Sequence, residues 1–502
     1  MTPFIVSPAN GSISDIAISK SKDMDDVPKH PLFSFRSHRL RICFLLAIAL
    51  YVGSANRMAL SVGVVCMANA TTGNSSGHAG SCVRPDVDEP ETLPNQGEMD
   101  WSPSQQTLLL SSSFYGSFIT VFVSGCFADQ FGAARVLFVA LGTSSVLTAL
   151  VPLLSRTSYH LLLASRVLIG MGESFFVPSI NCLATKWFPK QEKTTLAALY
   201  TSGLQLAAGF GSLLAAELCR SETLGGWPSI FYIFGTVSAI YLVLFTFFVN
   251  DNPEKSSWTS EDEKNYLRAM LPPPARKPSV RSAPWKAMLC SPPLHAILSC
   301  SFAFGFSTST VQAYLPTYLK EELGLPVKTI GLYTLAPFVA QIIAKAICGP
   351  LTDITARRGW ASLTNATKVA QFFGSFGASS MLLLLALVPS CENPHIVLPI
   401  LIGYGTVYAG GLCGFYTSLL TMSPLYTGTL SSLSQLCSML ASICASSLVT
   451  MLTTIDMPHK WTYIFGCAAF FQCAAGVHYL LCGSTEKQSW ADVRTQRKTR
   501  PA

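Results

Sequence analysis

Long apolar segments alternate with short polar ones along almost the whole chain. Twelve of them reach the length of about 20 residues that a helix needs to cross the roughly 30 Å hydrocarbon core of a bilayer. Lipid offers no partners for backbone hydrogen bonds, so such segments are expected to be α-helices. The expected spans are residues 41–67, 107–128, 133–154, 160–185, 195–219 and 227–250, followed by 291–318, 328–350, 367–389, 396–418, 428–452 and 460–483. The pattern predicts an all-α, polytopic membrane protein with two six-helix bundles at 41–250 and 291–483.

The composition agrees with this prediction. Of the 502 residues, 50% are hydrophobic and 12% are charged, against about 25% charged residues in soluble proteins. We therefore expect the lipid bilayer to cover much of the surface. The net charge of +7 does not indicate a nucleic-acid partner, because the basic residues are scattered through short loops and the two ends.

The charges between the apolar segments predict the orientation. Residues 251–290 hold seven Lys and Arg residues and three consecutive prolines, which is typical of a cytosolic linker between the halves. The tail at 484–502 is also basic, and residues 1–40 lack the features of a secretory signal. Both termini are therefore expected in the cytosol.

The segment at 68–106 has the opposite character. It contains six acidic residues and a single arginine, and it carries glycosylation sequons at Asn69 and Asn74. We expect this loop to face the outside of the cell or a lumen, with Asn74 the better acceptor because it stands further from the membrane.

A short motif occurs twice, after the second span of each expected bundle. The first copy contains Gly125, Asp129, Gly132 and Arg135, and the second contains Gly349, Asp353 and Arg357. Glycine lets helices approach closely, and the acids and bases are interpreted as a cytosolic latch that breaks when the bundles rock. The motif resembles the GxxxDxxGxx(R/K) signature of the major facilitator superfamily. Its repetition predicts two related bundles with the binding site between them.

Three ionisable residues fall deep inside expected spans. Arg57 lies in the middle of 41–67, and Arg166 and Glu173 lie about two turns apart on one face of 160–185. A charge at this depth costs on the order of 3 kcal/mol, so it normally faces a cavity and has a function. The arginine guanidinium holds a carboxylate or phosphate with two parallel hydrogen bonds. Arg57 and Arg166 are therefore candidate ligands of an anionic substrate.

Glu173 has two interpretations. It could carry a coupling proton, because burial and the neighbouring arginine act in opposite directions on its protonation, or it could form a structural ion pair with Arg166. Tyr115 and Gln205 are further candidates for substrate binding, and hydrogen bonding within their own helices is an equal alternative. Lys345, about one turn before Gly349, is interpreted as a snorkelling or latch residue rather than a substrate ligand.

The cysteines indicate no metal or cofactor. Many of the sixteen lie in apolar runs without CxxC spacing or a histidine partner, so we interpret them as small core residues. A phosphate-binding GxxxxGK(S/T) loop and a soluble domain to house it are also absent from the sequence, so nothing argues for an ATP-driven pump. Nothing in the sequence suggests an enzyme, and no cofactor is expected.

More specific motifs identify a narrower resemblance. The segment Arg166-Val-Leu-Ile-Gly-Met-Gly-Glu173, together with Met99-Asp-Trp101, Leu315-Pro-Thr-Tyr318 and Gln488-Ser-Trp-Ala491, resembles the family of sialin, the vesicular glutamate transporters and the sodium/phosphate cotransporters. The resemblance covers nearly all of the chain from Arg41 to Ala491. It implies that Arg57 and Arg166 meet an anionic substrate and that Glu173 takes part in proton coupling.

The leading hypothesis is a monomeric secondary active transporter of small organic or inorganic anions, driven by H⁺ or Na⁺. Some family positions differ, since Ala59 replaces a usual Asn and Ser418–Pro424 differs from the usual segment after the tenth span. The alternatives are a passive anion facilitator and a non-transporting receptor or scaffold with the same fold. Plasma membrane and vesicular or lysosomal membrane both remain open.

Overall fold

The structure is a computed structural model that describes residues 31–34, 37–67, 98–221, 225–271, 284–390, 393–455, 457 and 459–491. Every regular element in these ranges is a helix, and twelve spans among them are long and apolar enough to cross a membrane. The predicted all-α fold with six spans in each half is confirmed. The sequons at Asn69 and Asn74 lie outside the described residues.

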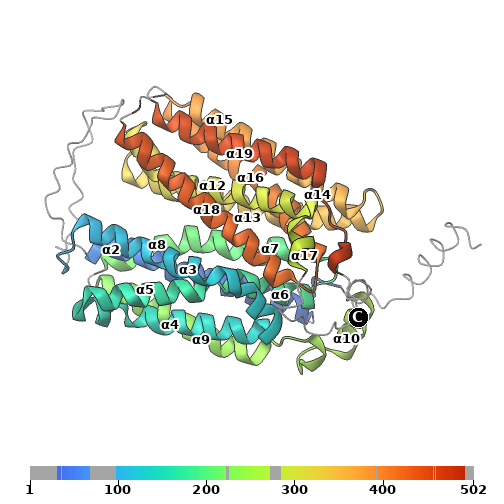
Figure 1. Cartoon of the computed structure of the whole chain (residues 1–502). Helices are drawn as coiled ribbons and strands as arrows, with labels where there is room; N and C mark the ends of the chain where they lie inside the picture. Colours follow the sequence, from blue (N-terminus) through green and yellow to red (C-terminus); the bar gives the residue numbers. More distant parts are fainter. Residues whose placement is uncertain are drawn as a thin grey trace, which may run out of the picture.

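The first six spans form the N-terminal bundle, the blue-to-green half of Figure 1. Two of its spans are interrupted. The fourth is split between α5 and α6, and the fifth contains a π-helical turn, η1. The elements are α2 (His38–Met67), α3 (Pro103–Phe131), α4 (Ala133–Thr157), α5 (Tyr159–Glu173), α6 (Phe176–Trp187), α7 (Lys193–Leu206), η1 (Ala207–Gly211), α8 (Ser212–Arg220) and α9 (Trp227–Phe248).

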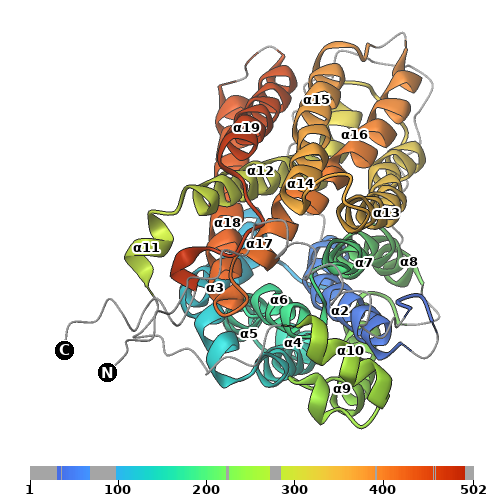
Figure 2. The same ribbon diagram turned by 90° about the vertical axis from the view of Figure 1, so that its right-hand side faces the viewer.

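The last six spans form the C-terminal bundle, the yellow-to-red half, which lies beside the first bundle in both views (Figures 1 and 2). Its third and fourth spans also contain π-helical turns, η5 and η7. The elements are α12 (Pro292–Glu321), α13 (Val327–Arg357), α14 (Leu363–Phe372), η5 (Phe373–Gly377), α15 (Ala378–Leu387), α16 (Val397–Gly411), η7 (Leu412–Tyr416), α17 (Thr417–Met422), α18 (Thr427–Thr454) and α19 (Lys460–Cys482).

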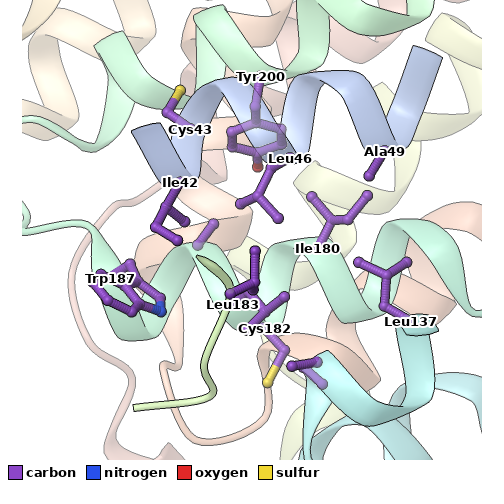
Figure 3. Close-up of a cluster of buried hydrophobic side chains, with 14 of the residues drawn as sticks. Ile42, Cys43, Leu46, Ala49, Leu137, Ile180, Cys182, Leu183, Trp187 and Tyr200 are labelled. Carbon is purple, nitrogen blue, oxygen red and sulfur yellow. The ribbon is translucent and has the colours of Figure 1, made fainter. Parts of the chain in front are cut away.

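Close backbone contacts hold each bundle together. A Cβ on Gly203 of α7 would lie 2.1 Å from the carbonyl oxygen of Ala47 in α2, and one on Gly170 of α5 would lie 2.0 Å from that of Ser113 in α3. Only glycine permits such distances, and close packing of this kind drives helix association in lipid. Larger side chains fill the space between α2, α6 and α7, where Leu46 and Ile180 are fully buried (Figure 3).

The linker adds a helix, α10 (Glu261–Met270), that docks on the N-terminal bundle. Its buried Glu263 carboxylate accepts hydrogen bonds from the backbone N–H groups of His38 (2.9 Å) and Arg39 (3.1 Å) at the start of α2. The Arg39 guanidinium pairs with Glu263 (3.0 Å) and with Glu192. Burial raises the pKa of the Glu192 carboxyl, and Arg39 opposes that rise. We call the end of the molecule where α10 lies the linker end, and the other the opposite end.

At the opposite end, a disulfide joins Cys66 in the last turn of α2 to Cys219 in α8. The prediction that the cysteines are small core residues is wrong for this pair. The two residues are 153 positions apart, and only the packing of α2 against α8 brings them together. The bridge therefore ties the first span to the fifth within one bundle.

Replacing Cys66 with Ser is expected to lower the midpoint of thermal unfolding, since a disulfide that closes a long loop contributes about 2–4 kcal/mol. Reductant should lower the wild-type midpoint to that of the variant and leave the variant unchanged. Cys300→Ser, at a buried free cysteine, is the control and should keep its response to reductant. Two alkylatable thiols at Cys66 and Cys219 in the unreduced wild type would contradict the bridge.

Candidate functional site

A cavity of about 140 Å³ lies between the two bundles. The N-terminal bundle contributes side chains of α2 and α7, and the C-terminal bundle contributes side chains of α12, α13 and α16. A site at the interface of two repeats is the arrangement expected for secondary transporters, because each bundle can move against the other around it.

The N-terminal side of the cavity is cationic and polar. Arg57 of α2 is partly exposed and lines the cavity together with Ser54 and with Gln205 of α7. Gln205 stands one residue before the end of α7, where the helix continues into the π-helical turn η1. Such turns interrupt the regular hydrogen bonding of a helix and are frequent at functional sites. The predicted placement of Arg57 and Gln205 at a cavity is therefore found in the structure.

The C-terminal side of the cavity is aromatic. The ring of Phe304 stacks on that of Tyr408, with centroids 4.5 Å apart and planes 11° apart. Tyr404 stacks on the same ring at 5.0 Å. The Tyr408 hydroxyl donates to the Phe304 carbonyl oxygen at 2.8 Å, so the stack is fixed in place. The cavity thus has a cation on its N-terminal side and, on its C-terminal side, a flat aromatic surface beside the polar side chains of Thr308, Gln312 and Gln341.

Arg166 and Glu173 lie in α5, outside the lining of this cavity. Arg166 is 1% exposed, and its Nε and Nη1 atoms have no hydrogen-bond partner among the described residues. The Glu173 Oε1 atom is also buried without a partner there. In the described part of the chain the two side chains form no direct ion pair, yet Arg57, Arg166 and Glu173 lie close enough for their charges to interact. The prediction that two arginines converge on one cavity holds for Arg57 alone in this arrangement.

The break after Glu173 has a local cause. α5 ends at Glu173 and α6 begins at Phe176, with Pro178 in its first turn. Proline has no N–H to donate to the carbonyl oxygen four residues earlier, and its ring clashes with that carbonyl. The proline thus interrupts the span and places Glu173 at a helix end near the middle of the membrane segment.

Tyr115 does not reach the cavity, so its predicted role in substrate binding is not supported. Its side chain is 57% exposed. The neighbouring Gly116 and Ser117 face α5, where the Ser117 hydroxyl donates to the Gly170 carbonyl oxygen at 2.7 Å. Tyr115 is therefore exposed and is not among the residues that line the cavity.

The acidic residues of the repeated motif, Asp129 and Asp353, close the linker end through equivalent contacts, one from each bundle. Asp129 of α3 accepts hydrogen bonds from the backbone N–H groups of Gly428 and Thr429, both at 3.0 Å, at the start of α18. Asp353 of α13 accepts from those of Thr194 (3.3 Å) and Thr195 (2.7 Å) at the start of α7. Each acid thus caps a helix of the other bundle, where the partial positive charge of the helix N-terminus stabilises a carboxylate.

The motif glycines permit these contacts. A Cβ on Gly125 would lie 2.0 Å from the Gly428 carbonyl oxygen, and one on Gly349 would lie 2.9 Å from the Cβ of Ala198. Gly132 has a φ of 99°, which favours glycine at the turn after α3. The two helix pairs across the interface, α3 with α18 and α7 with α13, are therefore in near-backbone contact.

The basic residues of the motif do not take part in the closed contact, although they were predicted to belong to the latch. Arg135 and Arg357 are exposed, and neither forms an ion pair with Asp129 or Asp353 in the ranges that the structure covers. The interpretation of the latch as an acid paired with bases is corrected, because helix N-termini supply the positive partner. The exposed bases remain in water, where a direct ion pair would add little stability.

Of the two interpretations of Lys345, snorkelling is wrong, whereas the contact between the bundles that a latch residue requires is present. The Lys345 side chain is fully buried, which excludes snorkelling, and its Nζ atom donates to Gln205 Oε1 (2.7 Å) and Thr201 Oγ1 (3.3 Å) of the other bundle. The signal was present, because the nearest charges in the sequence are Lys328 and Asp353. The cost of a charge inside the membrane, which selected Arg57, applies equally to Lys345.

Comparison with known proteins agrees with the fold. Residues 42–446 match the Major Facilitator Superfamily. A Drosophila melanogaster protein named putative inorganic phosphate cotransporter is 30% identical, over 89% of this chain and 86% of its own. A Mus musculus protein named probable small intestine urate exporter is 31% identical, over 92% and 94%. The solved structure of the proton:xylose symporter XylE covers 92% of this chain and 98% of that one, with 15% identity and a TM-score of 0.63, and shows a similar fold.

The repeated motif, the two bundles and these matches lead to one assignment. The chain is a transporter and not an enzyme. It belongs to the major facilitator superfamily and, within it, to the anion transporter family of sialin, the vesicular glutamate transporters and the sodium/phosphate cotransporters.

Proposed function

We propose that the cavity between the bundles binds a small anion through Arg57. The observation that supports this most directly is the position of Arg57, the one arginine in the cavity lining, opposite the stacked aromatic rings. A guanidinium in a site of low dielectric binds an oxyanion strongly, because both partners have lost water and the charges are poorly screened. Arg166, buried behind the lining, adds positive potential and becomes a direct ligand when α5 moves.

The aromatic wall favours an organic anion with a flat body over a bare inorganic ion. Phe304 and Tyr404 each stack on Tyr408, and the outer faces of this stack can pack against a flat ligand, whereas a phosphate ion has no surface that would use them. Relatives of this chain carry names of both kinds, phosphate cotransporter and urate exporter. Of these two substrates, urate has the planar ring and delocalised charge that suit the cavity better.

Glu173 is the proposed proton carrier. Its carboxyl group is buried at the end of α5 within the field of both arginines, so its protonation changes the net charge next to the anion. Protonation of Glu173 and anion occupancy would then favour each other by simple electrostatics. For this reason we propose H⁺ rather than Na⁺ as the coupling ion. A single chain is the proposed functional unit.

The linker end is proposed to face the cytosol. The basic linker supports this orientation, and so does the Cys66–Cys219 disulfide at the opposite end, because disulfides persist outside the cell or in an oxidising lumen. Both termini would then be cytosolic, and the loop with Asn69 and Asn74 would be open to glycosylation. The closed linker end corresponds to the outward-facing half of an alternating-access cycle. The proton-coupled mechanism suits either a plasma membrane or the membrane of an acidic organelle.

Arg57→Ala should lower anion uptake by about tenfold or more, since a hydrogen bond to a charged group contributes about 1.5–3 kcal/mol. The assay is uptake of radiolabelled urate and of phosphate by proteoliposomes under an inward proton gradient, and separately under a sodium gradient. Arg156→Ala is the matched control, because Arg156 pairs with Glu98 on the exposed surface at the opposite end. Equal uptake by the two variants would reject Arg57 as the anion ligand.

Glu173→Gln should abolish the coupling of transport to protons and leave anion exchange intact. A permanently neutral side chain is expected to retain anion exchange across the membrane and to lose accumulation driven by the proton gradient. Glu217→Gln, at an exposed position of α8, should behave like the wild type. Proton-driven accumulation that persists in Glu173→Gln, or a wild type driven by sodium alone, would contradict the proposed coupling.

Asp129→Ala should open the linker end. Loss of a helix cap costs about 1–2 kcal/mol, which shifts a two-state population roughly 5- to 30-fold. The native Cys126 thiol is the reporter, because it is 8% exposed at the bundle interface, 3.7 Å from the Thr429 hydroxyl. Maleimide should label Cys126 correspondingly faster in the variant, while Cys43, buried within the N-terminal bundle, stays protected. An unchanged Cys126 rate would show that this contact does not hold the end closed.

A further inference from the structure

Lys345 is a buried cation that the proposed transport site does not yet explain. It lies on α13 one turn beyond Gln341, which lines the cavity, and none of its side chain is exposed. Removing an ammonium group from water is expensive unless an opposite charge compensates it. In a membrane segment such a residue is retained where its charge has a use.

The partners of Lys345 are neutral. Its ammonium donates to the Gln205 amide oxygen and the Thr201 hydroxyl, both on α7 of the other bundle. No carboxylate of the described residues pairs with it or acts on its charge. An ammonium group has three hydrogens, so one donor position has no acceptor among the described residues, and the Cys413 thiol is the one ionisable group there that acts on its charge.

One side chain separates this charge from the cavity. Gln205 accepts the hydrogen bond of Lys345 and itself lines the cavity near Arg57. Gln341, which also lines the cavity, has a buried Nε2 atom without a partner among the described residues. Gln205 therefore stands between the ammonium and the cavity, and Gln341, one turn before Lys345 on the same helix, also lines the cavity.

A residue that only held the two bundles together by hydrogen bonds would not need a charge. A neutral amide could donate the same hydrogen bonds to Gln205 and Thr201 without the cost of burying an ion. What distinguishes Lys345 is its positive charge, which lies on the C-terminal bundle, whereas Arg57 and Arg166 lie on the N-terminal bundle.

We propose that Lys345 is the anion ligand of the C-terminal bundle, an inference that rests on the proposed function. When α13 separates from α7, the ammonium loses Gln205 and Thr201, and the bound anion replaces them. The substrate then bridges a cation on each bundle, Arg57 on one side and Lys345 on the other. The bound anion thereby compensates the charge of Lys345 as it loses its partners on α7, which lowers the cost of separating the two helices.

The test measures uptake of urate and of inorganic phosphate by proteoliposomes that contain the full chain. Lys345→Gln keeps hydrogen-bond donors and removes the charge, and it should raise KM about tenfold or more. Lys345→Met, a second neutral variant of similar length, should do the same and keeps the test decisive if the glutamine variant fails to fold. Lys345→Arg retains the charge and should recover most of the affinity.

Thr201→Val is the matched control. It removes one hydrogen bond between the bundles and leaves the ammonium in place, so KM should stay within about twofold of the wild type. If the neutral Lys345 variants and Thr201→Val change only the maximal rate, and to a similar extent, Lys345 only holds the two bundles together and the proposal is overturned. Unchanged kinetics in the neutral variants would overturn it as well.

A binding assay separates this inference from the proposed function. Urate or phosphate should raise the midpoint of thermal unfolding of the purified wild type and of Thr201→Val, and the shift should be lost in the neutral Lys345 variants. Loss of the shift in Arg57→Ala with full retention in Lys345→Met would support the cavity as the anion site and reject Lys345 as its ligand. If the wild type neither binds nor transports an anion, the proposed function and this inference fail together.

Discussion

The contact between a carboxylate and the start of a helix in the other bundle determines the arrangement of the whole molecule. Asp129 and Asp353 each make this contact, and the two are related by the repeat in the sequence. The bonds are strong because backbone N–H groups at a helix N-terminus lack partners within the helix and carry partial positive charge. They are also reversible, since water can satisfy both partners when the bundles separate. The cavity above them is closed on one side only while these contacts persist.

The cavity combines two kinds of surface that one bundle alone does not provide. The N-terminal bundle contributes the guanidinium of Arg57, and the C-terminal bundle contributes the stacked rings of Phe304 and Tyr408. A ligand that uses both surfaces binds better when the bundles are correctly juxtaposed, so its binding energy acts on their relative position. Specificity and conformational change would therefore draw on the same contacts.

The sequence predicted the spans, the two halves and the deep charges because the underlying rules are local. Apolar length determines a span, and the cost of burying a charge identifies Arg57, Arg166 and Glu173. Partners could not be predicted in the same way. The disulfide at Cys66, the exposure of Tyr115 and the bond from Lys345 to Gln205 depend on which faces of distant helices meet. Likewise, the basic partners expected for Asp129 and Asp353 are close in sequence, whereas the actual partners are backbone groups about 300 and 160 residues away.

The contact at Gly125 has a consequence for experiments on this transporter. With a Cβ position 2.0 Å from the Gly428 carbonyl oxygen, the closed interface has no room for even one methyl group. An alanine there acts as a wedge that excludes the closed arrangement without removing any charge or hydrogen-bonding group. The Gly125→Ala substitution, which adds a single carbon atom, should therefore favour the conformation in which the linker end is open.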